Sequence, residues 1–382
     1  MKEIIFFTNK FGDLNHIRNL IFYFEKKKFK IHILQNQLNN SISINDYKYN
    51  KIFKYLRFFP SNIFKVHNFV NYLRIKNKSK IFNFLSSYLL QISEKIFLYR
   101  KKKCFLKIIK EKSTVVFCGS IDNDILQLKN KLKFKTCYLL HGLKTHKRFK
   151  DKNFQKILEK KRLQKNLDRY IACNFNHWRT GGLKNRPFFL ASPRYGMPNK
   201  IFKKNITKSK YETLVVLDKI KWNFGKKTFY AFKINELKKI LDFLLKYSNK
   251  KTIIKFHPSL NVNYFDEIID FKKFKNCEVF INEKRTEELI FSSKKIIGFG
   301  SSSLMDAIFL KKFFLFPIHC VNYNSYFVQC CPKNISTNFK DFVKKFKNLD
   351  RIKTSNFKDE QYDKILGYNK KNLFEKYEKI II

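Results

Sequence analysis

The chain has 382 residues, enough for two α/β domains of about 150 to 200 residues each. Hydrophobic residues make up 44% of the chain and aromatic residues 17%, which excludes a disordered protein. Lysine and arginine number 81 against 30 acidic residues, a formal net charge of +51. These positive residues are spread along the whole chain, with neither an RNP-type aromatic motif nor zinc-finger spacing, so we do not expect sequence-specific nucleic-acid binding.

The positive charge favours an anionic membrane surface as a partner. Each lysine or arginine near such a surface contributes about 1 kcal/mol of attraction. No apolar run approaches the roughly 18 residues of a membrane-spanning helix, and residues 1–7 run into an expected strand rather than a signal peptide. We therefore expect a cytoplasmic protein with peripheral contact to the inner face of the plasma membrane.

The first half of the chain alternates expected strands and helices. Residues 3–8 form a short apolar strand, followed by a polar loop at 9–16 and an amphipathic helix at 17–27. With the next strand this is a βαβ unit, whose loop lies at the carboxyl edge of its first strand. Residues 47–112 are basic and aromatic, and they predict acceptor-side helices, one of them at 81–99. Further strands are expected at 29–34, 113–118, 135–140 and 169–173.

A domain boundary is expected near the middle of the chain. Residues 191–210 hold its strongest concentration of Pro, Gly and polar residues, so we expect an acceptor-side domain at 1–200 and a nucleotide-donor domain at 201–382. The second domain repeats the alternation, with a helix at 231–246. A helix is expected near 371–382, and it can pack back on the first domain. The strands of the second domain are expected at 213–217, 252–256, 278–281, 295–298 and 313–317.

Two groups of polar residues follow strands of the first domain. His141-Gly142 comes directly after an expected strand, where an imidazole with a near-neutral pKa can accept the proton of an attacking hydroxyl. Asp13 in the first loop is a rival base, and Asn15, His16 and Gly142 are candidates for substrate binding. The alternative is structural: His141 caps a turn, and the loop residues cap a helix.

A run of three serines marks the second domain. Ser301, Ser302 and Ser303 precede a helix, where hydroxyls and free backbone N–H groups form an anion site that suits a donor phosphate. Asp306, in that helix, is a candidate for binding a ribose hydroxyl. The alternatives are an ordinary helix cap for the serines and a surface carboxylate for Asp306.

A second strand of this domain also ends at candidate residues. His257-Pro258 follows the strand at 252–256, and the proline stiffens the exit from it. Lys255, within the strand, and His257 can offset the charge of a leaving phosphate. The carboxylates of the chain are few and scattered, so we expect neither a metal site nor a cofactor.

These motifs, in this order, resemble those of bacterial surface-polysaccharide transferases with the GT-B fold, over most of the chain. The closest resemblance by motif is to bacterial sialyltransferases and polysialyltransferases, whose His-Pro and Ser-Ser/Thr motifs bind the CMP part of CMP-sialic acid. Their catalytic acidic pair before a glycine is replaced here by Leu140-His141. The motifs also resemble CDP-glycerol glycerophosphotransferases of teichoic-acid assembly, whose interdomain Pro-Arg is echoed by Ser192-Pro193-Arg194.

The resemblance implies an α/β protein of the GT-B type, with two Rossmann-like domains facing across a cleft. It implies a metal-independent inverting glycosyltransferase that takes a sialic-acid-like sugar from a CMP-sugar and adds it to a glycan or glycolipid in capsule or lipooligosaccharide biosynthesis. One alternative is a CDP-glycerol-type glycerophosphotransferase of cell-surface polymers. Alternatives of another class are a non-catalytic polysaccharide-binding protein and a basic nucleic-acid-associated protein.

Overall fold

The fold is described by a computed structural model of the chain. It covers residues 2–8, 11–35, 79–119, 121–139, 146–149, 167–172, 188–195, 210–217, 221–224, 227–247, 251–256, 276–280, 286–299, 303–310, 312–325, 327–349 and 372–382, with short pieces between 52 and 73.

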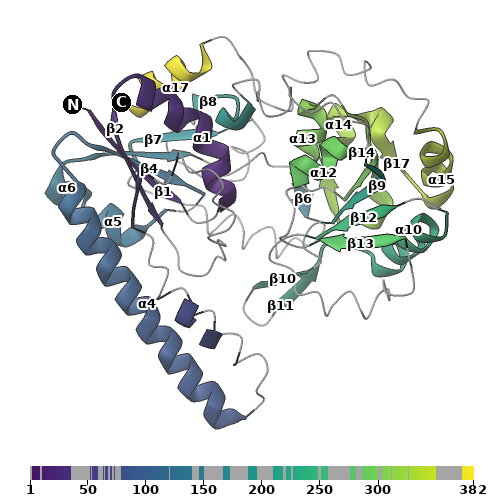
Figure 1. The fold of residues 1–382 in the computed structure, drawn as a ribbon, viewed down its shortest axis with the longest axis horizontal. Coiled ribbons are helices and arrows are strands. Elements are labelled where there is room, and N and C mark those ends of the chain that lie inside the picture. Colours follow the sequence, from purple (N-terminus) through teal and green to yellow (C-terminus); the bar gives the residue numbers. More distant parts are fainter. Residues whose placement is uncertain are drawn as a thin grey trace.

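The first half of the chain builds a seven-stranded parallel sheet (Figure 1). All six residues of its inner strand β1 are buried, as expected for a strand covered on both faces. The order across the sheet is β3-β2-β1-β4-β5-β7-β8. The strands are β1 (Glu3–Thr8), β2 (Lys30–Gln35), β3 (Leu56–Phe58), β4 (Thr114–Cys118), β5 (Lys135–Leu139), β7 (Arg169–Ala172) and β8 (Phe188–Phe189).

Helices cover both faces of this sheet, because alternate residues of β1 point to opposite sides. Ile4 and Phe6 share a core with helix α1 (Phe11–Lys26) and the C-terminal helix α17 (Leu373–Ile381). Ile5 and Phe7 share the other core with α4 (Lys80–Ile108) and α5 (Asn123–Gln127), next to the short α6 (Lys129–Leu132). The Tyr377 hydroxyl of α17 donates to the Ala191 carbonyl at 2.8 Å, so the last helix of the chain packs on the first sheet.

The second half builds a six-stranded parallel sheet in the order β13-β12-β9-β14-β15-β17. Its helices are α10 (Ile234–Tyr247), α12 (Thr286–Ser292), α13 (Leu304–Phe309) and α15 (Phe339–Lys347). Numbered within each sheet, both sheets read 3-2-1-4-5-6, with a seventh strand in the first, which is the Rossmann order. The strands are β9 (Tyr211–Val216), β12 (Thr252–Lys255), β13 (Cys277–Phe280), β14 (Ser293–Gly298), β15 (Phe314–Pro317) and β17 (Ile335–Ser336).

Two small sheets were not expected from the sequence. One is a hairpin of β10 (Lys221–Phe224) and β11 (Lys227–Tyr230). In the other, β6 (His146–Phe149) pairs antiparallel with β16 (Tyr323–Ser325), although β6 belongs to the first half of the chain and β16 to the second. The remaining short elements are η2 (Pro193–Tyr195), η4 (Ile318–Cys320), α14 (Phe327–Cys330) and η5 (Pro332–Asn334).

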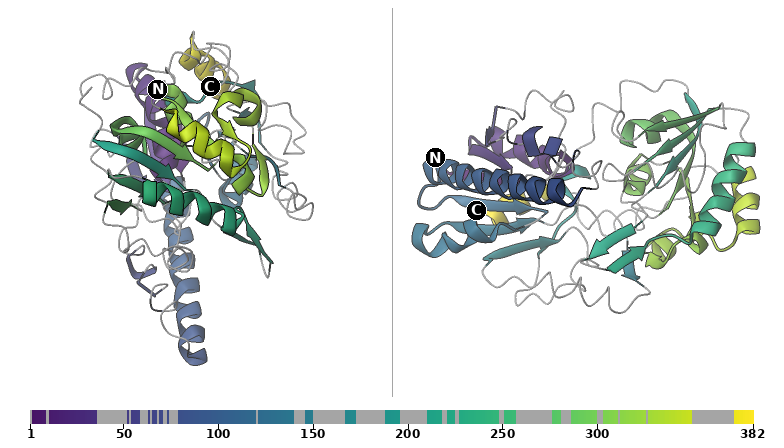
Figure 2. Two further views of the ribbon diagram at one scale, coloured as in Figure 1. Left: turned by 90° about the vertical axis from the view of Figure 1, so that its right-hand side faces the viewer. Right: turned by 90° about the horizontal axis from the view of Figure 1, so that it is seen from below.

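Two helices are longer than the sequence patterns predict. Helix α1 begins at Phe11 rather than at residue 17, and α4 continues nine residues past 99, to Ile108. Figures 1 and 2 show α4 extending away from the first sheet, with its amino end as the far tip. Among the described helices, none combines the length and apolarity needed to cross a membrane. The domain boundary expected at 200/201 stays a prediction, because residues 196–209 lie outside the described ranges.

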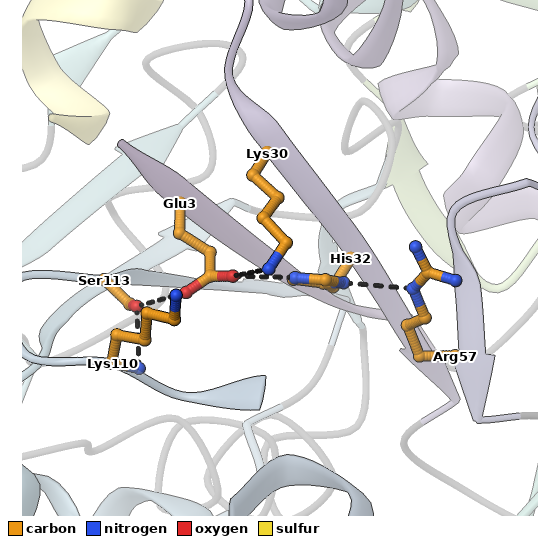
Figure 3. A network of polar contacts seen from close by, with 6 residues as sticks. All are labelled: Glu3, Lys30, His32, Arg57, Lys110 and Ser113. Atoms are coloured by element: carbon orange, nitrogen blue, oxygen red, sulfur yellow. Dashed lines mark hydrogen bonds and ion pairs between the residues drawn. The ribbon is translucent and has the colours of Figure 1, made fainter. Parts of the chain in front are cut away.

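A buried polar network ties together the first strands at their amino ends (Figure 3). Glu3 accepts from His32 Nε2 at 2.8 Å and from Ser113 Oγ at 3.2 Å, and it pairs with Lys30. Arg57 Nε donates to His32 Nδ1, so the proton of this neutral imidazole lies on Nε2. Burial raises the pKa of Glu3, but the bonds from His32 and Lys30 outweigh it and hold that pKa below its usual value. Burial lowers the pKa of His32 despite its bond to Glu3.

Candidate active site

Each large sheet reverses its strand order at one point. In the first sheet the chain runs outward from β1 to β3 and returns to β4, beside β1. In the second it runs outward from β9 to β13 and returns to β14, beside β9. Ligands of open α/β sheets bind outside the carboxyl ends of the strands at such a switch point. The turns that follow β1, β4, β9 and β14 are therefore the first places to look for a site.

The turn from β14 to α13 is closely packed. A Cβ at Gly298, the last residue of β14, would lie 2.2 Å from Leu304 Cδ2, so a larger residue here requires the buried Leu304 side chain to move. The Tyr323 hydroxyl of β16 donates to the Phe299 carbonyl at 2.7 Å and holds the exit of the strand. Ser303 is half-buried at the N-cap position of α13. Strand β16 thus contacts Phe299, and α13 begins after Ser303, on either side of residues 300–302.

Gly298→Ala is expected to lower the free energy of unfolding by about 2 kcal/mol, the usual cost of overpacking a closely packed core. In a Leu304→Ala background the same change should cost far less, because the colliding side chain is gone. Urea unfolding of the four members of this double-mutant cycle measures the coupling. An equal cost in both backgrounds would contradict the close packing assigned to this turn.

Most of the sequence-predicted motif residues lie outside the described ranges, so their roles stay predictions. The chain nevertheless determines where they attach: residues 140–145 connect β5 of the first sheet to β6, which pairs with β16 of the second half. The residues outside the described ranges are His141, Gly142, His257, Pro258, Ser301 and Ser302.

Lys255 is the described candidate at the end of β12. It is the last residue of that strand, and its side chain is buried. Its strand neighbours β9, so Lys255 lies one strand away from the switch point, in register with Val216. Its predicted role in offsetting the charge of a donor phosphate stays a prediction.

The polar residues after β1 lie in a helix and not in the expected loop. Asp13, Asn15 and His16 fall within the first turns of α1, and His16 is half-buried. The loop prediction was wrong because it took a polar run as irregular. The buried positions Leu14 and Ile17 extend the apolar face of α1 toward its amino end, and polar residues occupy the positions between them.

Arg194 connects the two halves of the chain. The short helix η2 that carries it is held by Asn19 of α1, whose Nδ2 donates to the carbonyls of Pro193 at 3.2 Å and Arg194 at 3.0 Å. The Arg194 guanidinium donates to Asp306 Oδ2 of α13 at 2.8 Å and to Glu287 of α12. All three charged side chains are largely buried, at 19%, 7% and 12% exposure.

The expectation that Asp306 is a surface carboxylate was therefore wrong. Its helix starts in the serine segment and turns Asp306 inward, where Arg194 compensates its charge. Arg18 of α1 is a second cation at this junction: burial lowers its pKa, and the nearby Glu287 opposes that shift. Sequence reasoning missed Arg18 and Glu287, since no local pattern joins residues this far apart. Among the described residues, no cluster of His, Cys, Asp and Glu could hold a metal ion.

Two Rossmann-like sheets in one chain, joined by the Arg194 ion pairs, with helices on their faces, define a fold of the GT-B type. No protein-family model and no curated protein sequence matches the chain.

Solved structures match the fold over the whole chain. The UDP-GlcNAc 2-epimerase of Methanocaldococcus jannaschii, in complex with UDP-GlcNAc and UDP, is 17% identical, with a TM-score of 0.56 and coverage of 100% of this chain and 99% of the other. The wall teichoic acid polymerase TagF is 15% identical, with a TM-score of 0.53 and coverage of 100% and 88%. The UDP-N-acetylglucosamine 2-epimerase of Rickettsia bellii is 13% identical, with a TM-score of 0.51 and coverage of 100% and 96%.

Proposed function

We propose that the chain is a metal-independent transferase that moves a group from a cytidine-nucleotide donor to a hydroxyl of a glycan or glycolipid. The observation that carries this proposal is the attachment of the candidate residues to the carboxyl ends of parallel strands in two Rossmann-like sheets. His141 follows β5, Lys255 ends β12 and the serine run follows β14. Arg194 joins the sheets by bonding α12 and α13 of the second half.

In the proposed reaction His141 accepts the proton of the acceptor hydroxyl, and the acceptor oxygen attacks the anomeric carbon of the donor sugar. The bond from that carbon to the phosphate oxygen breaks on the opposite side, which inverts the configuration. CMP leaves with the bonding electron pair. Lys255, His257 and the serine hydroxyls offset its negative charge.

The other sequence-predicted residues receive supporting roles in this proposal. Asp13 is the alternative base. Asn15, His16 and Gly142 contact the acceptor or the transferred group. Pro258 shapes the exit from β12, and Asp306, whose Oδ2 binds Arg194, lies in the helix that begins after the serines.

The donor has two candidates, each with an observation in its favour. The His-Pro and serine motifs favour a CMP-sugar of the sialic-acid type, as in capsule or lipooligosaccharide biosynthesis. The fold similarity to TagF favours CDP-glycerol. The structure of a TagF variant soaked with CDPG matches the chain with a TM-score of 0.54. With that donor the acceptor oxygen attacks the phosphorus that bears glycerol, and CMP is again the leaving group. In this proposal the protein acts at the cytoplasmic face of the plasma membrane, and its acceptor lies at that membrane.

A thermal-shift screen tests the proposal. The purified chain is heated with CMP, CMP-sialic acid, CDP-glycerol, UDP, UDP-GlcNAc and GDP, with cytidine as the control that lacks phosphate. A ligand at 100 times its dissociation constant adds about 2.7 kcal/mol to the stability of the folded state. CMP and one of the two cytidine donors should stabilise the protein, and the donor that does so selects the substrate. Selective stabilisation by UDP and UDP-GlcNAc would reject the cytidine donor in favour of an epimerase-like function, and no shift with any nucleotide would indicate a non-catalytic protein.

A further inference from the structure

Helix α4 has an apolar face that the described part of the protein leaves exposed. Ile81 and Phe84 are each 75% exposed and Tyr99 is 67% exposed. At 100° per residue the members of this face fall within an arc of about 100° along one side of the helix. A surface helix normally carries polar residues on this side. We call this surface the α4 face; its main members are Ile81, Phe84, Leu85, Tyr88, Ile92 and Tyr99.

The opposite side of α4 is already occupied. Phe97 and Phe105 are buried in the core of the first sheet. Nearer the tip, His67 Nδ1 bonds Ser93 Oγ at 2.7 Å and ties a neighbouring helical turn to α4. Val66 and Phe69, on either side of His67, are themselves 58% and 62% exposed. The exposed apolar surface in this part of the protein therefore comes from two segments, α4 and the turn around His67.

Charge varies along the helix as well as around it. Residues 81–93 contain no charged side chain. The following turns expose Glu94 among a majority of cations, and Lys95 and Lys102 lie at the helical angle of the α4 face. An apolar segment that leads into lysines is the pattern of helices that lie in a membrane interface, with the apolar side chains below the headgroups and the ammonium groups beside the phosphates. The exposed cations of this half are Lys95, Arg100, Lys102, Lys103 and Lys107.

From this arrangement we infer that the α4 face is the membrane-docking surface of the protein, and that it inserts into the interface of bilayers that contain anionic lipid. The inference rests on the membrane contact in the proposed function and assigns that contact to one helix. A second copy of the chain is the less favourable occupant, because both copies carry a net charge of +51 and repel each other. An anionic bilayer attracts the lysines that adjoin the α4 face.

The experiment measures sedimentation of the full chain with phosphatidylcholine vesicles, with and without phosphatidylglycerol. The face variant Phe84→Gln/Tyr88→Gln/Ile92→Gln keeps good helix formers at exposed positions. Its matched control is Tyr230→Gln/Tyr247→Gln/Val328→Gln, which removes exposed apolar side chains outside α4. The wild type and the control should bind the anionic vesicles, and the face variant should bind at least tenfold more weakly. Lys102→Gln/Lys103→Gln should weaken binding about fivefold for each lysine removed.

Insertion itself is measured with Tyr88→Trp, whose fluorescence should shift to the blue with anionic vesicles. Equal binding of wild type and face variant, no binding of the wild type, or no blue shift would overturn the inference. The inference would also be overturned if light scattering showed a wild-type dimer that becomes a monomer in the face variant, with no vesicle binding by either protein. The thermal shift that the nucleotide causes should be the same in the wild type and in all these variants. If the nucleotide shifts none of them, the proposed activity is rejected, whereas the result on membrane docking still holds.

Discussion

His141→Ala is expected to lower the rate of transfer by about 10²- to 10⁴-fold, the usual contribution of a general base. The nucleotide should still raise the melting temperature of this variant, because His141 is assigned to the acceptor and not to the donor phosphate. The transfer rate at saturating donor and the thermal shift with CMP, measured side by side, separate the two effects.

His257→Ala should show the opposite pattern, with donor binding affected more than the rate of transfer. Loss of a hydrogen bond to a charged phosphate should weaken donor binding by about tenfold or more, with transfer partly restored at high donor concentration. His146→Ala is the matched control, since it removes a histidine of the same segment, five residues after His141. Identical defects in the variants at 141 and 257, or a larger loss at 146 than at 141, would contradict the assigned roles.

Arg194→Ala is expected to lower the free energy of unfolding by about 3 kcal/mol, the low end of the cost of breaking a buried ion pair. It leaves Asp306 and Glu287 in a largely buried site without the guanidinium that they share. Arg18 remains near Glu287 in this variant, and its positive charge limits the loss of unfolding free energy. Urea unfolding should also show a broader or split transition, because this contact joins elements of the two sheets.

The control for Arg194 is Lys239→Ala, which breaks the exposed pair with Glu236 on α10. Exposed pairs of this kind contribute about 0.5 kcal/mol or less. If Arg194→Ala costs no more than Lys239→Ala, the junction contributes nothing to stability. Asp306→Asn should lose a similar amount to Arg194→Ala, and in the double variant the two losses should not add.

Ten of the thirteen strands described in the two large sheets could be predicted from the sequence to within about two residues, because each is a short apolar run that ends at a polar turn. The edge strands β3, β8 and β17 were not predicted, since each is only two or three residues long. The candidate residues could be found for the same reason: Lys255 ends such a run, and His141 and Ser303 follow one. The start of α1 could not be predicted, since Asp13, Asn15 and His16 look like a loop until Leu14 is known to be buried.

Other features of the candidate site carry no local signal. Arg194 lies 93 residues from Glu287 and 112 from Asp306, so no periodicity relates them. Strand β6, with the sequence His-Lys-Arg-Phe, has none of the apolar alternation of a strand, and only its pairing with β16 makes it one.

By itself the sequence determined the alternation of strands and helices, the two-domain α/β class and the residues that follow each strand, because apolar spacing and turn chemistry act within a few residues along the chain. The tertiary structure alone decided the order of the strands, the crossing of β6 to the second half, the burial of Asp306 against Arg194 and which apolar face of α4 is covered. Each of these depends on contacts between segments far apart in the chain. α4 shows the difference most directly: it has apolar residues on both sides, and only the packing of Phe97 and Phe105 on the first sheet leaves the α4 face exposed.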